Sequence, residues 1–105
     1  KRMSKATDDV LAERARQLSA EGFTTEHDDD HRKDSLARAG ACYAIHGSDA
    51  DHDRWLPRFE GVPEMWPWED GWWKPKDRRR DLVRAAAMLI AEIERIDRYS
   101  GASDV

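Results

Sequence analysis

The chain has 105 residues, with 18 Lys and Arg against 22 Asp and Glu, so its formal net charge is −4 at pH 7. This length excludes a β/α barrel or a two-domain enzyme, and we expect a single domain over 1–105 with an ordered core over about 7–98. The acidic balance argues against a general DNA or RNA binder, which needs a basic face. A domain of this size buries roughly 60–70 % of its unfolded surface, so we expect a thin core that a homo-oligomer would extend.

The cysteine content and hydropathy favour a cytoplasmic protein. The single cysteine, Cys42, cannot form a disulfide within the chain. The longest apolar run, Ala85–Ala91, is too short to cross a bilayer. No apolar segment follows the N-terminal Lys1-Arg2-Met3-Ser4, so no signal peptide is expected. We therefore expect no membrane partner.

The first predicted helix runs from about Thr7 to about Glu21. Leu11, Ala15 and Leu18 recur at i, i+4 and i+7, so they are expected to face the core. The second predicted helix begins near Asp34 or Ser35, runs to about His46, and is stopped by Gly47. One face of this second helix carries small residues: Ala37, Gly40, Ala41 and Ala44. Small side chains permit close approach, so we expect another helix or a ligand on that face.

The third predicted helix starts near Lys76 or Asp77 and ends at about Arg98. Its apolar residues recur at spacings of 3 and 4 and predict a broad face toward the core. They are Leu82, Ala86, Leu89, Ile93 and Ile96, with Val83 and Ile90 beside them. The predicted polar face holds Arg84, Glu92, Glu94 and Arg95.

The segment from His46 to Pro75 holds all five tryptophans and all four prolines of the chain. A long irregular segment of this kind is uncommon in a compact domain and often carries function. No segment alternates at period two for long enough to predict a strand. The fold class we expect is mainly α: a small three-helix domain with a long Trp/Pro-rich loop before the last helix.

An acidic loop, Glu26-His27-Asp28-Asp29-Asp30-His31, has the groups that bind divalent cations. Its spacing matches neither a calcium-binding hand nor a complete zinc motif. Three interpretations stay open: a solvated loop, a polar role in a ligand site through Glu26, His27 and Asp28, or a metal site. We expect no metal and no cofactor to be required.

The stretch Trp72-Trp73-Lys74-Pro75-Lys76-Asp77-Arg78-Arg79-Arg80 places indoles and cations at the start of a predicted helix. Free N–H groups and the helix dipole favour an anion there, and the cations can add charged hydrogen bonds to phosphate. Because a helix turns ~100° per residue, at most one or two of the three arginines can point into one site. The alternative is that the arginines pair with Asp77, Asp81 and the acidic loop.

A third group of polar residues lies on the first predicted helix. Arg14 and Gln17 are three residues apart and share a side, whereas Arg16 points elsewhere. They either form a solvated helix face or reach the acidic loop or an anion.

Taken together, these motifs resemble a family of small proteins encoded by phages and prophages, over roughly residues 12–98. The matching stretches are Glu13-Arg14-Ala15-Arg16-Gln17, Glu21-Gly22-Phe23-Thr24, Glu26-His27-Asp28-Asp29, Ala41-Cys42-Tyr43-Ala44, Trp66-Pro67-Trp68, Trp72-Trp73-Lys74-Pro75, Asp77-Arg78-Arg79-Arg80-Asp81-Leu82-Val83 and Ala91-Glu92-Ile93-Glu94-Arg95-Ile96-Asp97-Arg98. A weaker resemblance is to the ryanodine-receptor-type repeat domain of phage and bacterial immune proteins. It is carried by Arg16, Gly22-Phe23, Asp28-Asp29 and Asp77-Arg78, with Phe where that domain has Trp and with an added Trp-rich insertion.

The phage resemblance implies a protein in the cytoplasm of the bacterial host cell and does not by itself supply a function. The weaker resemblance is to domains proposed to bind nucleotide-derived ligands, and with the cations and indoles above it leads us to expect a protein that binds and sequesters such a ligand. Such ligands include the cyclic nucleotide or ADP-ribose-type signals of bacterial defence. The expected ligand-binding residues are Arg14, Gln17, Glu26, His27, Asp28, Trp72, Trp73, Lys74, Arg78 and Arg79. The expected partners are this small molecule and further copies of the chain, and no catalytic residue is predicted.

Two other functions stay open. One is a protein–protein inhibitor of a host defence complex, such as a CRISPR complex or a nuclease, with tryptophans as interface anchors. The other is a metal-dependent nucleotide phosphohydrolase with His27, Asp28, Asp29 and His31 as ligands.

Overall fold

The computed structural model describes residues 3–19, 35–48 and 61–100. These ranges form three α-helices and one short 3-10 turn: α1 (Lys5–Ser19), α3 (Ser35–His46), η1 (Asp70–Trp72) and α5 (Arg78–Ser100). They contain no strand. The expected fold class, mainly α with a Trp/Pro-containing loop before the last helix, is confirmed. None of these helices is both long and apolar enough to cross a membrane. The predicted end of the first helix and the acidic loop lie outside the described residues.

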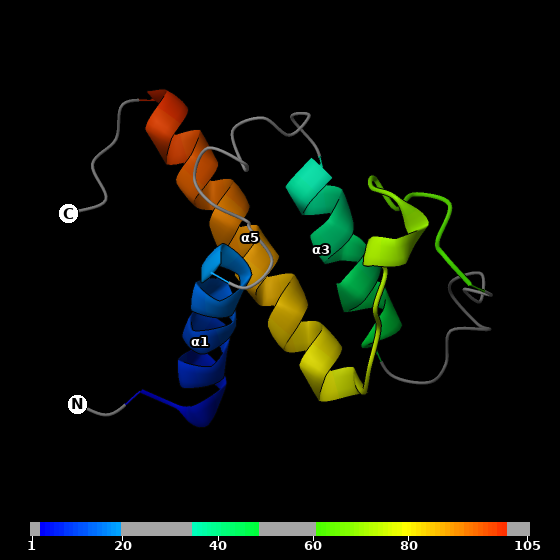
Figure 1. Cartoon of the computed structure of the whole chain (residues 1–105). Helices are drawn as coiled ribbons and strands as arrows, with labels where there is room; N and C mark the ends of the chain where they lie inside the picture. Colours follow the sequence, from blue (N-terminus) through cyan, green and yellow to red (C-terminus); the bar gives the residue numbers. More distant parts are fainter. Residues whose placement is uncertain (1–2, 20–34, 49–60, 101–105) are drawn as a thin grey trace.

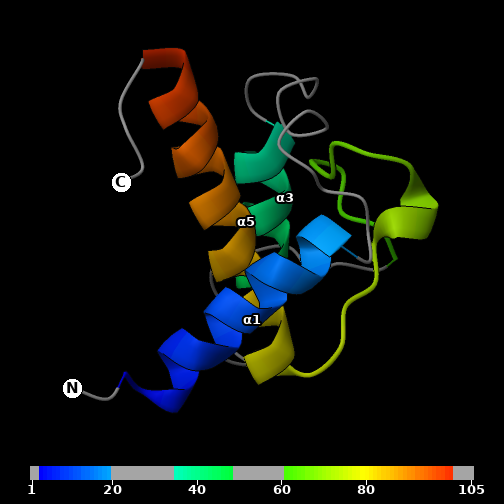
Figure 2. The same cartoon turned by 60° about the vertical axis from the view of Figure 1, so that its left-hand side comes forward.

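Helix α5 is the central element, and both α1 and α3 pack against it (Figures 1 and 2). The contact with α3 is close at Gly40, where an added Cβ would lie 3.3 Å from the Ala85 carbonyl oxygen. It is closer still at Gly47, where a Cβ would lie 2.9 Å from the Arg78 carbonyl oxygen. The prediction that the small-residue face of α3 meets another helix is thus confirmed at Gly40.

An aromatic core lies between α3, α5 and the Trp-containing loop. Tyr43 meets Trp66 edge-on, with ring centroids 5.6 Å apart, and Trp73 at 4.7 Å. The Tyr43 hydroxyl also accepts a 3.0 Å hydrogen bond from the backbone N–H of Lys74. Ala39, Cys42, Ala85 and Met88 complete this buried cluster. The loop is therefore fixed to α3 by packing and by a hydrogen bond.

The prediction of the buried helix faces is wrong. Leu11 and Leu18 of α1 are exposed, and so are four of the expected core residues of α5: Leu82, Leu89, Ile93 and Ile96. Val83, which was expected to widen the core face, is buried, and the rest of the buried side of α5 carries Ala85, Ala87, Met88 and Ala91, together with Asp81, Arg84 and Arg95. Small side chains let α3 approach α5 closely, and the buried polar residues have partners within the chain.

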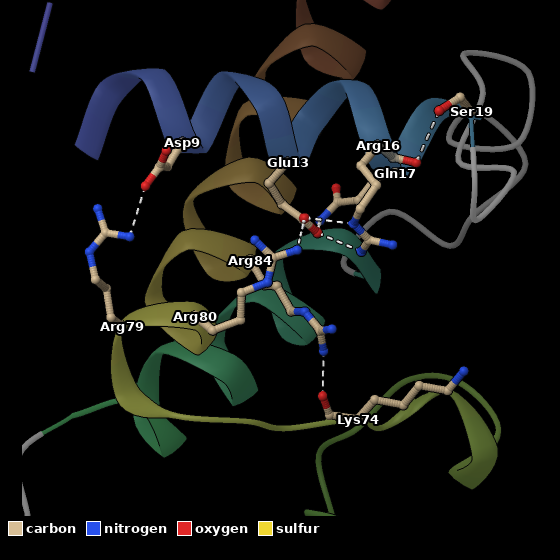
Figure 3. Close-up of polar contacts among 9 residues, drawn as sticks. All are labelled: Asp9, Glu13, Arg16, Gln17, Ser19, Lys74, Arg79, Arg80 and Arg84. Atoms are coloured by element: carbon tan, nitrogen blue, oxygen red, sulfur yellow. Dashed lines mark hydrogen bonds and ion pairs between the residues drawn. The ribbon is translucent and has the colours of Figure 1, made fainter. Parts of the chain in front are cut away.

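Helix α1 is attached to α5 through buried polar groups. The Glu13 carboxylate accepts hydrogen bonds from Arg16 Nε at 2.7 Å, Arg16 Nη2 at 2.7 Å, Gln17 Nε2 at 3.0 Å and Arg80 Nη2 at 2.5 Å (Figure 3). Further along, Arg14 Nε donates to Glu94 at 3.1 Å. The contact between α1 and α5 thus depends on a buried carboxylate with several donors.

The start of α5 is defined by two aspartates. Asp77 caps the helix by accepting a 2.9 Å hydrogen bond from the backbone N–H of Arg80. Asp81, fully buried, accepts a 2.7 Å hydrogen bond from the backbone N–H of Lys76 and pairs with His46 Nδ1 at 2.7 Å. Asp81 therefore connects the end of α3 to the start of α5, and the predicted start near Asp77 is confirmed.

We predict that Glu13→Gln lowers the free energy of unfolding by about 2 kcal/mol at pH 7, the size of a lost charge-assisted hydrogen bond. Burial alone raises the pKa of Glu13, but hydrogen bonds from Arg16 and Gln17 and the charges of Arg16 and Arg80 outweigh burial and lower that pKa below 4.5. The stability that Glu13 contributes is therefore present above pH 4.5 and is lost as the pH falls through the folded-state pKa.

Urea denaturation at several pH values measures both effects. The Glu13→Gln variant should lose less stability than the parent between about pH 5 and about pH 3, because it lacks the titrating group. The matched control is Glu64→Gln, since Glu64 is exposed. Equal behaviour of the two variants would contradict the role given to Glu13.

Candidate functional site

The cations expected to bind phosphate do not converge. Arg78 Nε donates to the Gly47 carbonyl oxygen at 3.2 Å, and Arg79 pairs with Asp9 at 2.8 Å. The next residue, Arg80, pairs with Glu13 (Figure 3). The three arginines point in different directions because each residue of a helix is rotated by ~100° from the one before it. Arg14 pairs with Glu94 on another part of α5. The structure thus directs Arg14, Arg78 and Arg79 to three separate places.

A pocket is formed where α1, α3, α5 and the Trp-containing loop meet. The space around it, open solvent included, is about 320 Å³, but the volume open to the centre of a water molecule is about 10 Å³, room for about one water. Its lining residues are Glu13, Gln17, Tyr43, Trp66, Trp68, Trp72, Lys74, Arg84 and Met88. We call this the Trp pocket. Three of the residues expected at the site, Gln17, Trp72 and Lys74, come together here.

Two buried side chains present polar atoms without a partner in the Trp pocket. Gln17 is 1 % exposed and donates to Glu13, but its Oε1 accepts no hydrogen bond within the part of the chain that the structure describes. Arg84 is 7 % exposed and donates through Nη1 to the Lys74 carbonyl oxygen, while its Nε has no partner in the same ranges (Figure 3). A buried unpaired polar group costs about 1–3 kcal/mol. Both atoms are fully buried, with less than 1 Å² of each exposed, so a bound molecule would reach them only after neighbouring side chains move.

The wall and the rim of the Trp pocket differ in exposure. Trp66 is buried, packs edge-on against Trp68 at 5.3 Å, and donates from Nε1 to the Glu69 carbonyl oxygen at 3.1 Å. Trp72 is 47 % exposed, and the Lys74 ammonium lies 5.9 Å from the centre of its ring. The pocket thus has a packed aromatic wall and an exposed rim of one indole and one cation.

The lining of the Trp pocket includes the cations Lys74 and Arg84 and the carboxylate of Glu13. That carboxylate is already bonded to Arg16 and Arg80, so its charge is compensated inside the protein. Lys74 is the exposed cation of this lining, and the exposed Glu69 and Asp70 stand just before Trp72 in the chain.

The remaining residues predicted from the sequence either do not line the Trp pocket or lie outside the described residues. Trp73 is half-buried against Tyr43 and edge-on to His46 at 5.7 Å, and it does not line the Trp pocket. Glu26, His27 and Asp28 lie outside the described residues. Within the ranges that the structure covers, no group of three or more His, Cys, Asp or Glu could hold a metal ion.

Two reactive or titratable groups, the Cys42 thiol and the His46–Asp81 pair, contribute to packing. Burial raises the pKa of the Cys42 thiol, although the charge of Arg38 acts in the opposite direction, and a neutral thiol is a poor nucleophile. The pair of His46 and Asp81, which the sequence did not predict, links the ends of two helices beside the ring of Trp73. The positions of both groups are explained by the fold.

The tryptophans can be separated into packing and site residues by their effect on stability. We predict that Trp66→Ala costs about 3 kcal/mol or more, because it empties a buried position. Trp72→Ala should cost less than about 1 kcal/mol, because its ring is half exposed. Urea denaturation followed by circular dichroism compares the two. Equal losses would show that Trp72 is also a packing residue.

Comparison of the chain with protein-family models, with curated proteins and with solved structures finds no match. The function therefore has to be argued from the geometry of the site. That geometry combines buried hydrogen-bonding atoms, an aromatic wall and a cationic rim in one pocket.

Proposed function

We propose that the chain binds a nucleotide-derived small molecule in the Trp pocket and holds it without converting it. The observation that carries this proposal is the pair of buried, unpartnered atoms, Gln17 Oε1 and Arg84 Nε, in a pocket lined by indoles. Buried polar groups in proteins nearly always have partners, so these two exceptions call for a partner, which in this proposal is the ligand or a water that it holds.

The residue types of the Trp pocket match a nucleobase. An amide oxygen accepts from an exocyclic amine, and a guanidinium N–H donates to a ring nitrogen or a carbonyl oxygen. Trp72 supplies an exposed ring on which a base can stack, an interaction worth about 1–3 kcal/mol. The enclosed part of the pocket has room for about one water molecule, so a base would stack at the rim on Trp72 and enter further only if neighbouring side chains move. The proposal therefore places the base against the exposed indole, with the phosphates outside.

Lys74 provides the second half of a nucleotide site. Its ammonium lies at the rim beside Trp72, where a phosphate attached to a stacked base would emerge. The arginines at the start of α5 contribute to folding in this proposal, since Arg80 holds Glu13 and Arg78 holds the Gly47 carbonyl oxygen. The phosphate contact is thus assigned to Lys74.

The resemblance to phage-encoded proteins supports a biological role for such binding. A small protein that holds a nucleotide signal without turnover lowers the free concentration of that signal. We propose that this protein sequesters a cyclic nucleotide or ADP-ribose-type signal of bacterial defence. The alternative, inhibition of a host defence protein, is favoured by one observation: Trp72 is an exposed indole, and such residues anchor protein interfaces.

Binding is tested by titrating the protein with cyclic dinucleotides, cyclic ADP-ribose isomers and mononucleotides, using tryptophan fluorescence and calorimetry. For a ligand that binds, we expect Trp72→Ala to weaken affinity about tenfold or more, as loss of stacking predicts. Lys74→Ala should weaken affinity about threefold or more and remove part of its salt dependence.

Two matched controls keep the test specific. Tyr99→Ala removes an exposed aromatic ring and Lys76→Ala removes an exposed lysine, both outside the Trp pocket. Both should bind within about twofold of the parent. If no panel member binds below about 100 µM, or if the pocket variants bind like their controls, the proposal is wrong. Recovery of a chemically altered ligand would favour the phosphohydrolase instead.

A further inference from the structure

The side of α5 that faces away from the Trp pocket is apolar and exposed. Leu82 is 42 % exposed, Leu89 43 %, Ile93 57 % and Ile96 52 %. With Ala86 between them, these residues follow one another at spacings of 4, 3, 4 and 3, the heptad spacing of a coiled-coil seam. At 100° per residue they fall within about 80° of one another. We call this set of five residues the α5 stripe.

Among residues 3–19, 35–48 and 61–100, no other element covers the α5 stripe along its length. Helix α3 reaches only one edge, where Gly40 lies against Leu89 and Gly47 against Leu82. Helix α1 lies on the opposite flank, where Arg79 pairs with Asp9 and Arg14 pairs with Glu94. The stripe is bounded by both neighbouring helices and covered by neither, because its large side chains stay more than two-fifths exposed.

The charges beside the α5 stripe are complementary between its two ends. Arg79 and Asp97 are 18 residues apart, which is five full helical turns, so they lie on the same flank at opposite ends. Arg79 pairs with Asp9 of its own chain but its side chain stays 54 % exposed, and a guanidinium has enough N–H donors to meet a second carboxylate. If a second α5 ran antiparallel across the stripe, each Arg79 would face the second copy's Asp97. A parallel second copy would place the two Arg79 side chains on opposite flanks of the pair, each about 27 Å along the axis from either Asp97.

The apolar side chains fit the same arrangement. A two-fold axis that brings Arg79 opposite Asp97 crosses α5 at about the level of Met88. It brings Leu82 opposite the second copy's Ile93 and Ala86 opposite its Leu89. Large residues then face each other at the two outer levels and a large residue faces a small one at the two inner levels, while Ile96 comes level with the second copy's Arg79 or Arg80.

We propose that the α5 stripe is the interface of a homodimer in which two copies of the chain pair their α5 helices antiparallel. Arg84, which lines the Trp pocket, is two residues from Leu82 and so lies about 160° around the helix from it. Dimerisation therefore leaves both Trp pockets open. A helix of 23 residues is about 34 Å long, and one such pair is at the lower limit of stable interfaces. We expect a reversible dimer with a dissociation constant of roughly 1–100 µM.

Sedimentation equilibrium from about 5 to about 500 µM measures this dissociation constant directly. We expect Ile93→Glu to weaken dimerisation at least tenfold, because it places a charge in the seam. The matched control is Leu11→Glu, which alters an exposed leucine on α1 and should leave dimerisation within about twofold of the parent. Thermal melts verify that each variant is folded.

Charge reversal tests the antiparallel direction. Arg79→Glu alone should weaken dimerisation about two- to fivefold, since it opposes the second copy's Asp97. The double variant Arg79→Glu with Asp97→Arg should dimerise with the affinity of the parent, because the opposite charges again face each other. In a parallel pair the second substitution would not restore the affinity. The proposal is overturned by a monomer throughout the concentration range, or by a dimer that Ile93→Glu leaves intact. If the double variant dimerises no more tightly than Arg79→Glu alone, the antiparallel arrangement is overturned.

Discussion

The buried carboxylate of Glu13 is the interaction on which the arrangement of the helices depends. Helix α1 buries no large apolar side chain, and its buried residues are Glu13, Arg14 and Gln17. Placing a charge in the interior is costly unless hydrogen bonds replace its hydration. Arg16, Gln17 and Arg80 supply those bonds. The same bonds hold α1 against α5 and orient the Gln17 amide, so one carboxylate determines both a helix contact and a wall of the Trp pocket.

A second constraint positions the other wall. The backbone of Lys74 is held from both sides, because its N–H donates to the Tyr43 hydroxyl and its carbonyl oxygen accepts from Arg84. Trp66 is buried in the same cluster, whereas Trp72 extends from it into solvent. The chain therefore presents an exposed indole and a lysine from a fixed backbone. This is the form of preorganisation that lowers the entropic cost of binding a ligand.

The sequence predicted the elements better than their contacts. The bounds of α3 and α5 follow from local signals, such as the Asp77 cap and Gly47, which act within a few residues. The buried side of α5 could not be predicted in this way, because hydrophobic periodicity assumes that apolar residues are inside. Here Arg84, Arg95 and Asp81 are buried with partners, and the Leu/Ile stripe is outside.

The sequence predicted only part of the candidate site, because local signals do not show which residues distant in the chain meet in the fold. Trp72 and Lys74 were predicted from their place at the start of a helix and Gln17 from its spacing to Arg14, and all three line the Trp pocket. Arg84 was assigned to a polar outer face, so its place in the pocket was not predicted. Where Arg78 and Arg79 point depends on Gly47 and Asp9, which are distant in sequence and close only in the folded chain.

A double-mutant cycle on Glu13 and Arg80 tests the central claim most directly. Urea denaturation at pH 7 would give the free energies of unfolding of the parent, Glu13→Gln, Arg80→Met and the double variant. We predict a coupling energy of about 1 kcal/mol or more, because the two side chains form a 2.5 Å ion pair that attaches α1 to α5. Additive losses, with a coupling below about 0.3 kcal/mol, would contradict the account.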